Sequence, residues 1–473
     1  MLVFVATLLG TFAVALLGRR HSKRVGSATL SDHRLNKWLV GLSAGATANS
    51  GFVVTAAVGL GYSFGVHWIL LPLSWLLGDA MFWIFFPQRI NATGRAVGAT
   101  TMTDVIVHDL DQRPQLALKR IVAILIIICL GGYVSAQWLA GQKFLNGAFG
   151  LSGPIGLALF AAIIVCYTAI GGFRGSVYVD SMQAVIRIGG TVIALAAVFY
   201  VASQSPIDFW RNIHAAGPTF LKIIPDNHYL VAIPFIFGFA AAALGFGLGQ
   251  PQMVTRYLAG ATPAETRSAW AIYNFFVQFT WISMTVFGVV LRGIIPSLSD
   301  PEAGLSTFFR LKAGPIFTGI IVADIFATIA ATSNSLLVAM AQTTSRDLGG
   351  PNWHRQAEDL WPVTALLGAG TMLLSLNLHG TVFALALLSV SLLGAALAPA
   401  MLVRILHLRS TGTSLTASVL AGFTTAALWS YFGLSGTMNE AAPGMLIAFA
   451  TNFVLARLPA RSGARGGLRD ADS

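Results

Sequence analysis

Long apolar stretches, separated by short polar segments, make up almost the whole chain. About thirteen of them contain roughly 17 to 30 residues each, which is enough for a helix to cross a bilayer. They cover residues 2–18, 38–64, 66–88, 120–147, 151–172, 178–202, 228–249, 265–294, 314–341, 361–378, 380–405, 413–432 and 443–457. The pattern predicts an all-α polytopic membrane protein in which no soluble domain separates the spans.

Two of these stretches are interrupted by glycine and other small residues. The segments are LSAGATANSG (42–51) and FGFAAAALGFGLGQPQ (237–252). This composition is typical of close packing between helices, and also of broken helices whose free backbone groups line a site. The two segments begin two successive groups of five spans, 38–202 and 228–405, and therefore have opposite orientations in the membrane. Because an inverted repeat has this property, the spacing favours a mid-membrane site between two broken helices.

The composition supports a membrane protein. Only 10% of the 473 residues are charged and 55% are hydrophobic, whereas about 25% of residues are charged in typical soluble domains. The two cysteines, Cys129 and Cys166, lie inside apolar stretches and show neither disulfide nor metal-ligand spacing. A net charge of +11 suits either nucleic acid or an anionic membrane surface, and the distribution of the charge decides between them.

The basic residues gather on one side of the predicted membrane. Arg19, Arg20, Lys23 and Arg24 directly follow the first span, so the positive-inside rule places the N-terminus outside and, by alternation, the C-terminus in the cytoplasm. The outer segments then hold few basic residues: Lys143, Arg211, Lys222, Arg292, Arg310 and Lys312. We therefore expect an integral protein of a lipid bilayer, the bacterial inner membrane, with no nucleic-acid partner.

Charged side chains also occur inside the predicted spans. Asp79, Arg187 and Asp324 lie near the centres of their spans, where a charge costs on the order of 3 kcal/mol and is normally paired or faces a cavity. Arg187 follows Asp180 by seven residues, which is about 10 Å along one helix face. The sequence therefore predicts paired or functional charges near the middle of the membrane.

Four segments resemble motifs of the sodium/solute symporter family, which includes proline permeases and sugar symporters. They are LSAGATANSG (42–51), TAIGGFRGSVYVDSMQA (168–184), GLGQPQMVTRYLA (247–259) and FATIAATSNSLLVAMAQTTSRDL (326–348), and they occur in the family's order. The resemblance implies a five-plus-five inverted-repeat core like that of leucine-type transporters, with one extra helix before the core and two after it. It also implies secondary transport of a small organic solute by alternating access, usually together with sodium.

The resemblance divides a single transmembrane transporter domain into five parts. An extra helix and a basic cytoplasmic loop cover 1–36, and the first repeat covers 37–205. The second repeat covers 226–408, two peripheral helices cover 409–458, and a basic cytoplasmic tail covers 459–473.

In this family the conserved cation lies between the first and eighth core helices. The resemblance places the carbonyls of Ala46 and Asn49 at the first-helix positions and Ala327 at the family's small residue. Ala330 and Ala331 stand where two hydroxyl side chains are expected. A methyl group cannot coordinate sodium, a hard cation that takes oxygen ligands, so we expect an atypical or lost sodium site. A shifted register would restore one hydroxyl, from Thr328, Thr332, Ser333 or Ser335.

Asp180 matches a family aspartate near the inner gate, whereas Arg187 stands where the family carries an apolar residue. Asp324 lies on the face of the eighth core helix that is expected to hold the cation. One hypothesis is that the Arg187 guanidinium, paired with Asp324, takes the place of sodium. The other is that the two residues form a structural pair between helices. Because arginine stays charged, a coupled proton would be carried by Asp324, Asp79 or Asp180.

The predicted pocket argues against a sugar. Val53 and Pro72 stand at the positions of the glutamine and the acidic residue of sugar symporters, and Ala243 at that of a tryptophan of the proline permease. Tyr133 suits either a pocket or helix packing. The residues expected to line a small, mainly apolar pocket are Asn49, Ser50, Tyr133, Gln137, Phe239 and Phe246. An amino acid or small organic acid is therefore favoured as the substrate.

The sequence carries no catalytic motif that could act at these depths. We therefore expect no enzyme activity and no cofactor, apart from a coupling ion, Na+ or H+. The alternative function is a transporter-like sensor that binds a solute and signals through a partner, because some histidine kinases carry such a domain. The C-terminal segment RLPARSGARGGLRDADS does not resemble a kinase module, so this alternative requires a separate signalling partner.

Overall fold

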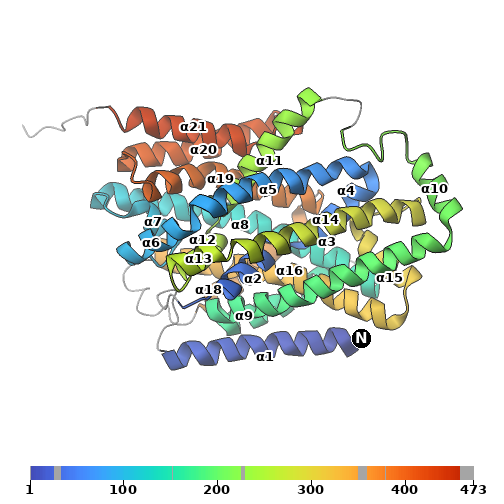
Figure 1. Ribbon diagram of the computed structural model, residues 1–473. Helices are drawn as coiled ribbons and strands as arrows, with labels where there is room; N and C mark the ends of the chain where they lie inside the picture. The colour runs from blue at the N-terminus through green and yellow to red at the C-terminus, as the bar shows by residue number, and fades with distance from the viewer. Residues whose placement is uncertain are drawn as a thin grey trace, which may run out of the picture.

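The computed structural model describes residues 2–25, 34–151, 153–224, 229–349, 360–378 and 380–458. Within these residues the regular structure is helical, apart from one isolated bridge between Leu35 and Gly260 (Figure 1). The elements are α1 (Leu2–Val25), α2 (Lys37–Ala48), α3 (Gly51–Val54), α4 (Ala56–Phe64), η2 (Val66–Ile69), α5 (Leu70–Phe85), α6 (Pro87–Val97), α7 (Met102–Val107), α8 (Gln112–Phe149), α9 (Gly153–Gln204), α10 (Pro206–Ala215), α11 (Tyr229–Gly249), α12 (Pro251–Leu258), α13 (Pro263–Ser268), α14 (Trp270–Ile294), η4 (Pro301–Ala303), α15 (Gly304–Lys312), α16 (Pro315–Thr343), η5 (Thr344–Leu348), α18 (Trp361–Asn377), α19 (Val382–Ile405), α20 (Gly412–Tyr431), η6 (Leu434–Gly436) and α21 (Ala441–Leu455). The predicted basic tail, 459–473, lies outside the described residues.

The helices lie where the apolar pattern predicts them, but not every helix is long and apolar enough to count as a membrane span. In the described part of the chain, eight helices are long and apolar enough to cross a membrane, or nine if α2 and the α3–α4 segment count as one span bent by 58°. Each predicted stretch contains a helix, but α9 holds two of the stretches, and α18, α20 and α21 are each too short or not apolar enough to be counted. The count of about thirteen spans therefore stays a prediction.

Helix α9 consists of two segments that reverse direction at Gly172. Its φ of +59° lies in the left-handed region that glycine adopts without steric cost. Before the turn, the Phe160 ring packs against Phe326 of α16, with ring centroids 5.8 Å apart. After the turn, Arg187 reaches Asp324 at nearly the same level of α16. The turn thus places two antiparallel segments along one helix.

Two helices are broken within the bundle. Asn49 and Ser50 separate α2 from α3, inside the predicted segment 42–51. Gln250, with φ −99° and ψ 114°, separates α11 from α12. This second break falls near the end of the predicted segment 237–252, and the preceding apolar residues form continuous helix. Both breaks leave backbone groups that require partners inside the protein.

The first and last helices lie on opposite sides of the core. Helix α1 packs against α9 and α16, and the pair α20 and α21 packs against α19 on the other side (Figure 1). The contact between α1 and α9 is close, because a Cβ on Gly18 would lie 2.5 Å from the Cα of Gly175. This arrangement agrees with one extra helix before the core and two after it.

One end of the bundle carries a partly buried ionic cluster, and this end, which also holds Arg95 and Arg404, is called the basic end below. Lys119 lies 3.2 Å from Asp104 and 3.3 Å from Asp347. Burial opposes ionisation of Asp104, but Lys119 and the hydrogen bonds from Thr100 outweigh it and hold the pKa of Asp104 below its ordinary value. By the positive-inside rule, this end is predicted to face the cytoplasm.

Helices α4 and α14 cross at glycines. A Cβ on Gly288 would lie 2.1 Å from the carbonyl oxygen of Val58, and one on Gly61 would lie 2.2 Å from that of Thr285. The backbones can approach this closely only because both positions lack a side chain.

Gly288→Ala is expected to lower the free energy of unfolding by about 1–3 kcal/mol, because the added methyl forces the two backbones apart. The measurement is the thermal unfolding midpoint of the purified protein in detergent. Gly370→Ala in α18 is the control, since no heavy atom lies within 4 Å of its Cβ position. Equal midpoints for the two variants would contradict the close crossing.

Candidate functional site

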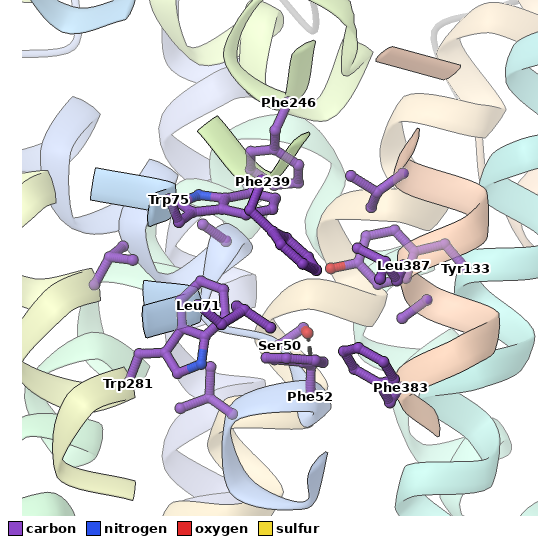
Figure 2. Close-up of a pocket in the computed structure, with 15 residues that line it drawn as sticks. Ser50, Phe52, Leu71, Trp75, Tyr133, Phe239, Phe246, Trp281, Phe383 and Leu387 are labelled. Atoms are coloured by element: carbon purple, nitrogen blue, oxygen red, sulfur yellow. Dashed lines mark hydrogen bonds between the residues drawn. The ribbon is translucent and has the colours of Figure 1, made fainter. Parts of the chain in front are cut away.

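A pocket lies beside the break between α2 and α3, enclosed by α5, α8, α11, α14 and α19 (Figure 2). It holds about 530 Å³ of space, including its open mouth. The lining residues are Ala48, Ser50, Phe52, Val53, Leu71, Trp75, Tyr133, Phe239, Phe246, Val277, Trp281, Phe383, Ala386, Leu387 and Val390. A concave, mostly apolar lining with a few polar groups is typical of sites for small organic molecules.

The broken helix supplies polar groups at this pocket. The Ser50 hydroxyl accepts a hydrogen bond from the Phe52 N–H at 3.2 Å, and the Tyr133 hydroxyl of α8 lies within hydrogen-bonding reach of Ser50. The Gly51 N–H donates to Oε1 of Gln137 at 2.9 Å. These contacts partner the amides that the break releases, as a membrane interior requires.

Aromatic rings form most of the pocket wall. The Trp281 ring lies 5.1 Å from Phe52 and 5.5 Å from Trp75, measured between ring centroids. Trp75 also lies 5.7 Å from Phe246, and Phe52 lies 5.5 Å from Phe383. The lining contains no charged side chain, so the groups it offers to a solute are ring faces, hydroxyls and backbone groups.

Four of the six residues predicted for the pocket line it: Ser50, Tyr133, Phe239 and Phe246. Asn49 and Gln137 lie beside it instead. The Asn49 side chain donates to the hydroxyl of Thr280, and Gln137 binds the Gly51 N–H, so both support the break. Val53 lines the pocket. The position that holds a glutamine in sugar symporters therefore presents an apolar side chain to the pocket here.

Several large lining residues lie outside the sequence motifs and were not predicted. The clearest signal is a spacing of four residues, in Leu71 and Trp75 on α5 and in Val277 and Trp281 on α14, which places each pair on one helix face. Such pairs are equally typical of ordinary helix packing. The sequence therefore could not distinguish them from core residues.

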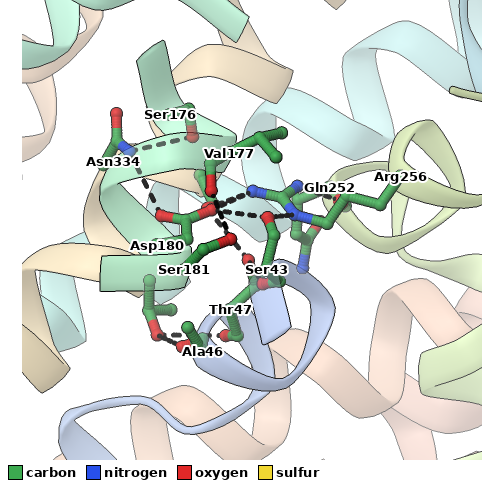
Figure 3. Close-up of polar contacts among 12 residues, drawn as sticks. Ser43, Ala46, Thr47, Ser176, Val177, Asp180, Ser181, Gln252, Arg256 and Asn334 are labelled. Atoms are coloured by element: carbon green, nitrogen blue, oxygen red, sulfur yellow. Dashed lines mark hydrogen bonds and ion pairs between the residues drawn. The ribbon is translucent and has the colours of Figure 1, made fainter. Parts of the chain in front are cut away.

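A second, polar cluster joins four helices between the pocket and the basic end (Figure 3). The guanidinium of Arg256, on α12, donates to Asp180 of α9 at 2.7 Å, and both side chains are almost fully buried. Ser43 of α2 and Ser335 of α16 also donate to Asp180, at 2.9 and 3.1 Å. Asp180 thus lies at the junction of both broken helices with α9 and α16.

Two hydroxyls of α16 reach α2: that of Ser335 lies 2.9 Å from the Thr47 hydroxyl, and that of Thr332 contacts the backbone. The Thr332 hydroxyl donates to the carbonyl oxygens of Thr47 and Ala46, at 3.0 and 3.4 Å, and Ala330 and Ala331 contribute buried methyl groups beside it. The register is therefore one in which Thr332 binds the carbonyls of the first helix and Ser335 contacts one of its hydroxyls. The Thr332 contacts bring three oxygen atoms together, fewer than the six or so that hard cations generally take.

Arg187 and Asp324 form a buried ion pair between α9 and α16. Nη1 of Arg187 lies 2.5 Å from Oδ2 of Asp324, and the side chains are 1% and 0% exposed. Among the described residues, Nε and Nη2 of Arg187 and Oδ1 of Asp324 have no hydrogen-bond partner. Gly190 provides the space, because a Cβ there would lie 2.3 Å from Cγ of Asp324.

Arg187→Met is expected to lower the free energy of unfolding by about 3–5 kcal/mol, because it leaves the Asp324 carboxylate buried without a counter-charge. Adding Asp324→Leu removes the second charge, and most of the lost stability is expected to return. Thermal unfolding in detergent measures both effects. A double variant as unstable as Arg187→Met would show that the pair does not account for the loss.

Comparisons with known proteins show the family of the chain. A family model described as "Sodium:solute symporter family" matches residues 29–422. The osmoregulated proline transporter OpuE of Bacillus subtilis (strain 168) is 25% identical over 96% of this chain and 94% of its own. The high-affinity proline transporter PutP of the same strain is 25% identical over 94% and 95%.

Solved structures show the same fold. A Na+-coupled sialic acid symporter, in its substrate-bound outward-open state, superposes with a TM-score of 0.77 at 18% identity, covering 96% of this chain and 97% of that one. MhsT in complex with L-phenylalanine superposes with a TM-score of 0.51 at 14% identity, covering 88% and 98%. The predicted fold class, an all-α core of the leucine-transporter type, is thereby confirmed. With the family model spanning most of its length, the chain belongs to the sodium:solute symporter family and is a membrane-embedded solute transporter.

Proposed function

We propose that this protein is a secondary active transporter of a small amino acid, or of a small organic acid, that works by alternating access. The observation that carries the proposal is the uncharged, ring-lined pocket at the α2–α3 break. A site of this kind binds a small solute at mid-membrane, where either side can in turn gain access to it.

The polar cluster around Asp180 has the position of a gate. It joins α2, α9, α12 and α16 on the side of the pocket that leads to the basic end. A solute leaving by that route requires Arg256 and Asp180 to separate. Because an ion pair between moving helices can form and break as a unit, the cluster suits one of two discrete states.

Of these two classes the pocket favours the amino acid, which carries no net charge, over an organic acid, which enters as an anion. A single free charge would enter a lining that offers no counter-charge, at a high desolvation cost. A zwitterionic amino acid carries both charges close together, so backbone groups of the broken helix suffice to bind them. Relatives named as proline transporters support proline as the first solute to test, whereas Val53 removes a partner for sugar hydroxyls.

The proposal also concerns the coupling ion, because the usual sodium site is altered. The oxygen atoms at Ala46, Thr47 and Thr332 form a weaker cage than sodium requires. We propose that the fixed charge of Arg187, paired with Asp324 of α16, takes the place of sodium, and the competing hypothesis is a purely structural pair. For the sensor alternative, relatives whose names describe transport favour flux over signalling.

The first test is exchange of labelled proline by the protein in proteoliposomes. Trp281→Ala is expected to raise the half-saturation concentration about tenfold, equivalent to about 1.4 kcal/mol, because it removes a ring that contacts Phe52 and Trp75. Trp270→Ala is the control, since Trp270 lies on the same helix and is 55% exposed. Saturable binding without any exchange would favour the sensor.

The second test is thermal unfolding of the wild type in NaCl against choline chloride at equal ionic strength. We expect no sodium-specific rise, although a site saturated at 100 times its Kd would stabilise by about 2.7 kcal/mol. Sodium sensitivity is expected to appear in the triple variant Arg187→Ala, Ala330→Ser, Ala331→Thr. A sodium-specific rise in the wild type would overturn the altered site, and an insensitive triple variant would leave the structural pair as the role of Arg187.

A further inference from the structure

Three carboxyl groups lie buried at membrane depth in the described core, and only two of them have a cation. Asp180 pairs with Arg256 at 2.7 Å, and Asp324 pairs with Arg187 at 2.5 Å. Asp79, on α5, is 1% exposed, and its Oδ2 has no hydrogen-bond partner among the described residues. Asp79 is therefore chemically different from the other two acids.

Asp79 lies directly below the pocket, toward the basic end. On α5 it follows Trp75, a lining residue, by one helical turn. On the antiparallel helix α14, Tyr273 precedes Val277, another lining residue, by the same interval. The Tyr273 hydroxyl is within hydrogen-bonding reach of Asp79. Two neighbouring helices thus place an acid and a phenol one turn inside the pocket floor.

A layer of aromatic rings separates Asp79 from the basic end. Trp83 lies one turn further along α5, with its ring 5.0 Å from Tyr273 and 5.4 Å from Tyr257. Phe82 lies 5.2 Å from Tyr257, and all four side chains are at most 1% exposed. On the α11 side, a Cβ at Gly78 would lie 2.0 Å from a backbone carbonyl. This tight packing leaves little space for water beside the carboxyl.

The groups that face Asp79 include no free cation among the described residues. The Tyr273 and Tyr257 hydroxyls lie close to Asp79. The Tyr133 hydroxyl, at the pocket, lies close to that of Tyr273. The described side chains of α11 carry no titratable group. On α14, Arg292 lies nineteen residues beyond Tyr273, which is about 28 Å of helix. The charged or titratable residues on the other packed elements are His67 on η2, Arg89 and Arg95 on α6, and Arg256 on α12.

None of these four residues is placed to neutralise Asp79. Arg256 is engaged with Asp180, and Arg95 binds backbone carbonyls of the loop after α12. His67 precedes Asp79 by twelve residues, on η2, and Arg89 follows it by ten, on α6, where it is exposed. A carboxyl in this environment avoids a large desolvation cost by binding a proton.

We propose that Asp79 is the binding site for a proton that is transported together with the solute. In the closed state the Asp79 carboxyl is neutral and shares a hydrogen bond with the Tyr273 hydroxyl. When the helices separate at the basic end, water reaches the carboxyl, and the proton passes to that water, leaving a carboxylate. Reprotonation through the open pocket resets the site. The inference rests on the proposed function, which supplies the alternating access.

The first test needs no substrate. Infrared difference spectra of the reconstituted wild type and Asp79→Asn are expected to show a protonated-carboxyl C=O band at neutral pH in the wild type and its loss in the variant. Asp208→Asn, on the exposed ion pair of α10, is the control and is expected to keep the band. No band lost in Asp79→Asn would mean an ionised carboxyl and would overturn the proposal.

A second variant covers the case in which Asp79→Asn does not fold. Tyr273→Phe removes the hydroxyl near Asp79 and is expected to shift the frequency of the same band. A band that stays unmoved in Tyr273→Phe would show that it does not arise from Asp79, and the proposal would be rejected.

The transport arm uses labelled proline in sodium-free proteoliposomes with an inwardly directed proton gradient. The wild type is expected to accumulate proline, and Asp79→Asn is expected to lose accumulation, while Asp208→Asn accumulates as the wild type does. Exchange without gradient-driven accumulation in the wild type would overturn the coupling role. If the wild type exchanges no proline, the proposed substrate is wrong, and the infrared band alone decides the proton site.

Discussion

A charge inside a bilayer must be neutralised within the protein, and this constraint organises the centre of the molecule. The pairs Arg187–Asp324 and Arg256–Asp180 are both almost completely buried. Each joins helices from opposite halves of the repeat, α9 with α16 and α9 with α12. Since removing one member of a buried pair costs several kcal/mol, the relative positions of these helices are tied to the pairing of their charges.

The same constraint applies to the backbone where helices break. Ser50 caps α3, and Gln137 accepts from the amide of Gly51, so the break exposes few unpaired groups to hydrocarbon. Glycines at Gly61 and Gly288 allow α4 to lie directly against α14. The pocket lies where the helix is broken, and nearby side chains bind the backbone amides that the break leaves without a helical partner.

The chemistry of the site follows from which charges have been paired. Both arginines at membrane depth are engaged by carboxylates, so the pocket itself stays uncharged and aromatic. At the α2–α16 contact, Thr332 offers a single hydroxyl to the carbonyls of α2. The fixed guanidinium of Arg187 and the acid Asp79 below the pocket are the observations on which the proposed proton coupling rests.

Much of the architecture could be predicted from the sequence, because helices in a membrane satisfy their own hydrogen bonds and reveal themselves by apolar length. The sequence alone predicted the apolar stretches, the small-residue break at Asn49 and Ser50, and the position of Arg187 among apolar residues. Four pocket residues could be placed through the family's motifs.

Only the tertiary structure decided how residues distant in sequence meet. It showed that Thr332, and not Ala330 or Ala331, reaches the first helix, because a helix's rotation about its own axis depends on all its neighbours. It also added Trp75 and Trp281 to the pocket, since an aromatic side chain looks the same in sequence whether it packs or binds. The sequence by itself determined that buried charges were present, whereas their pairing, and the lack of a cation beside Asp79 among the described residues, depended on distances between helices.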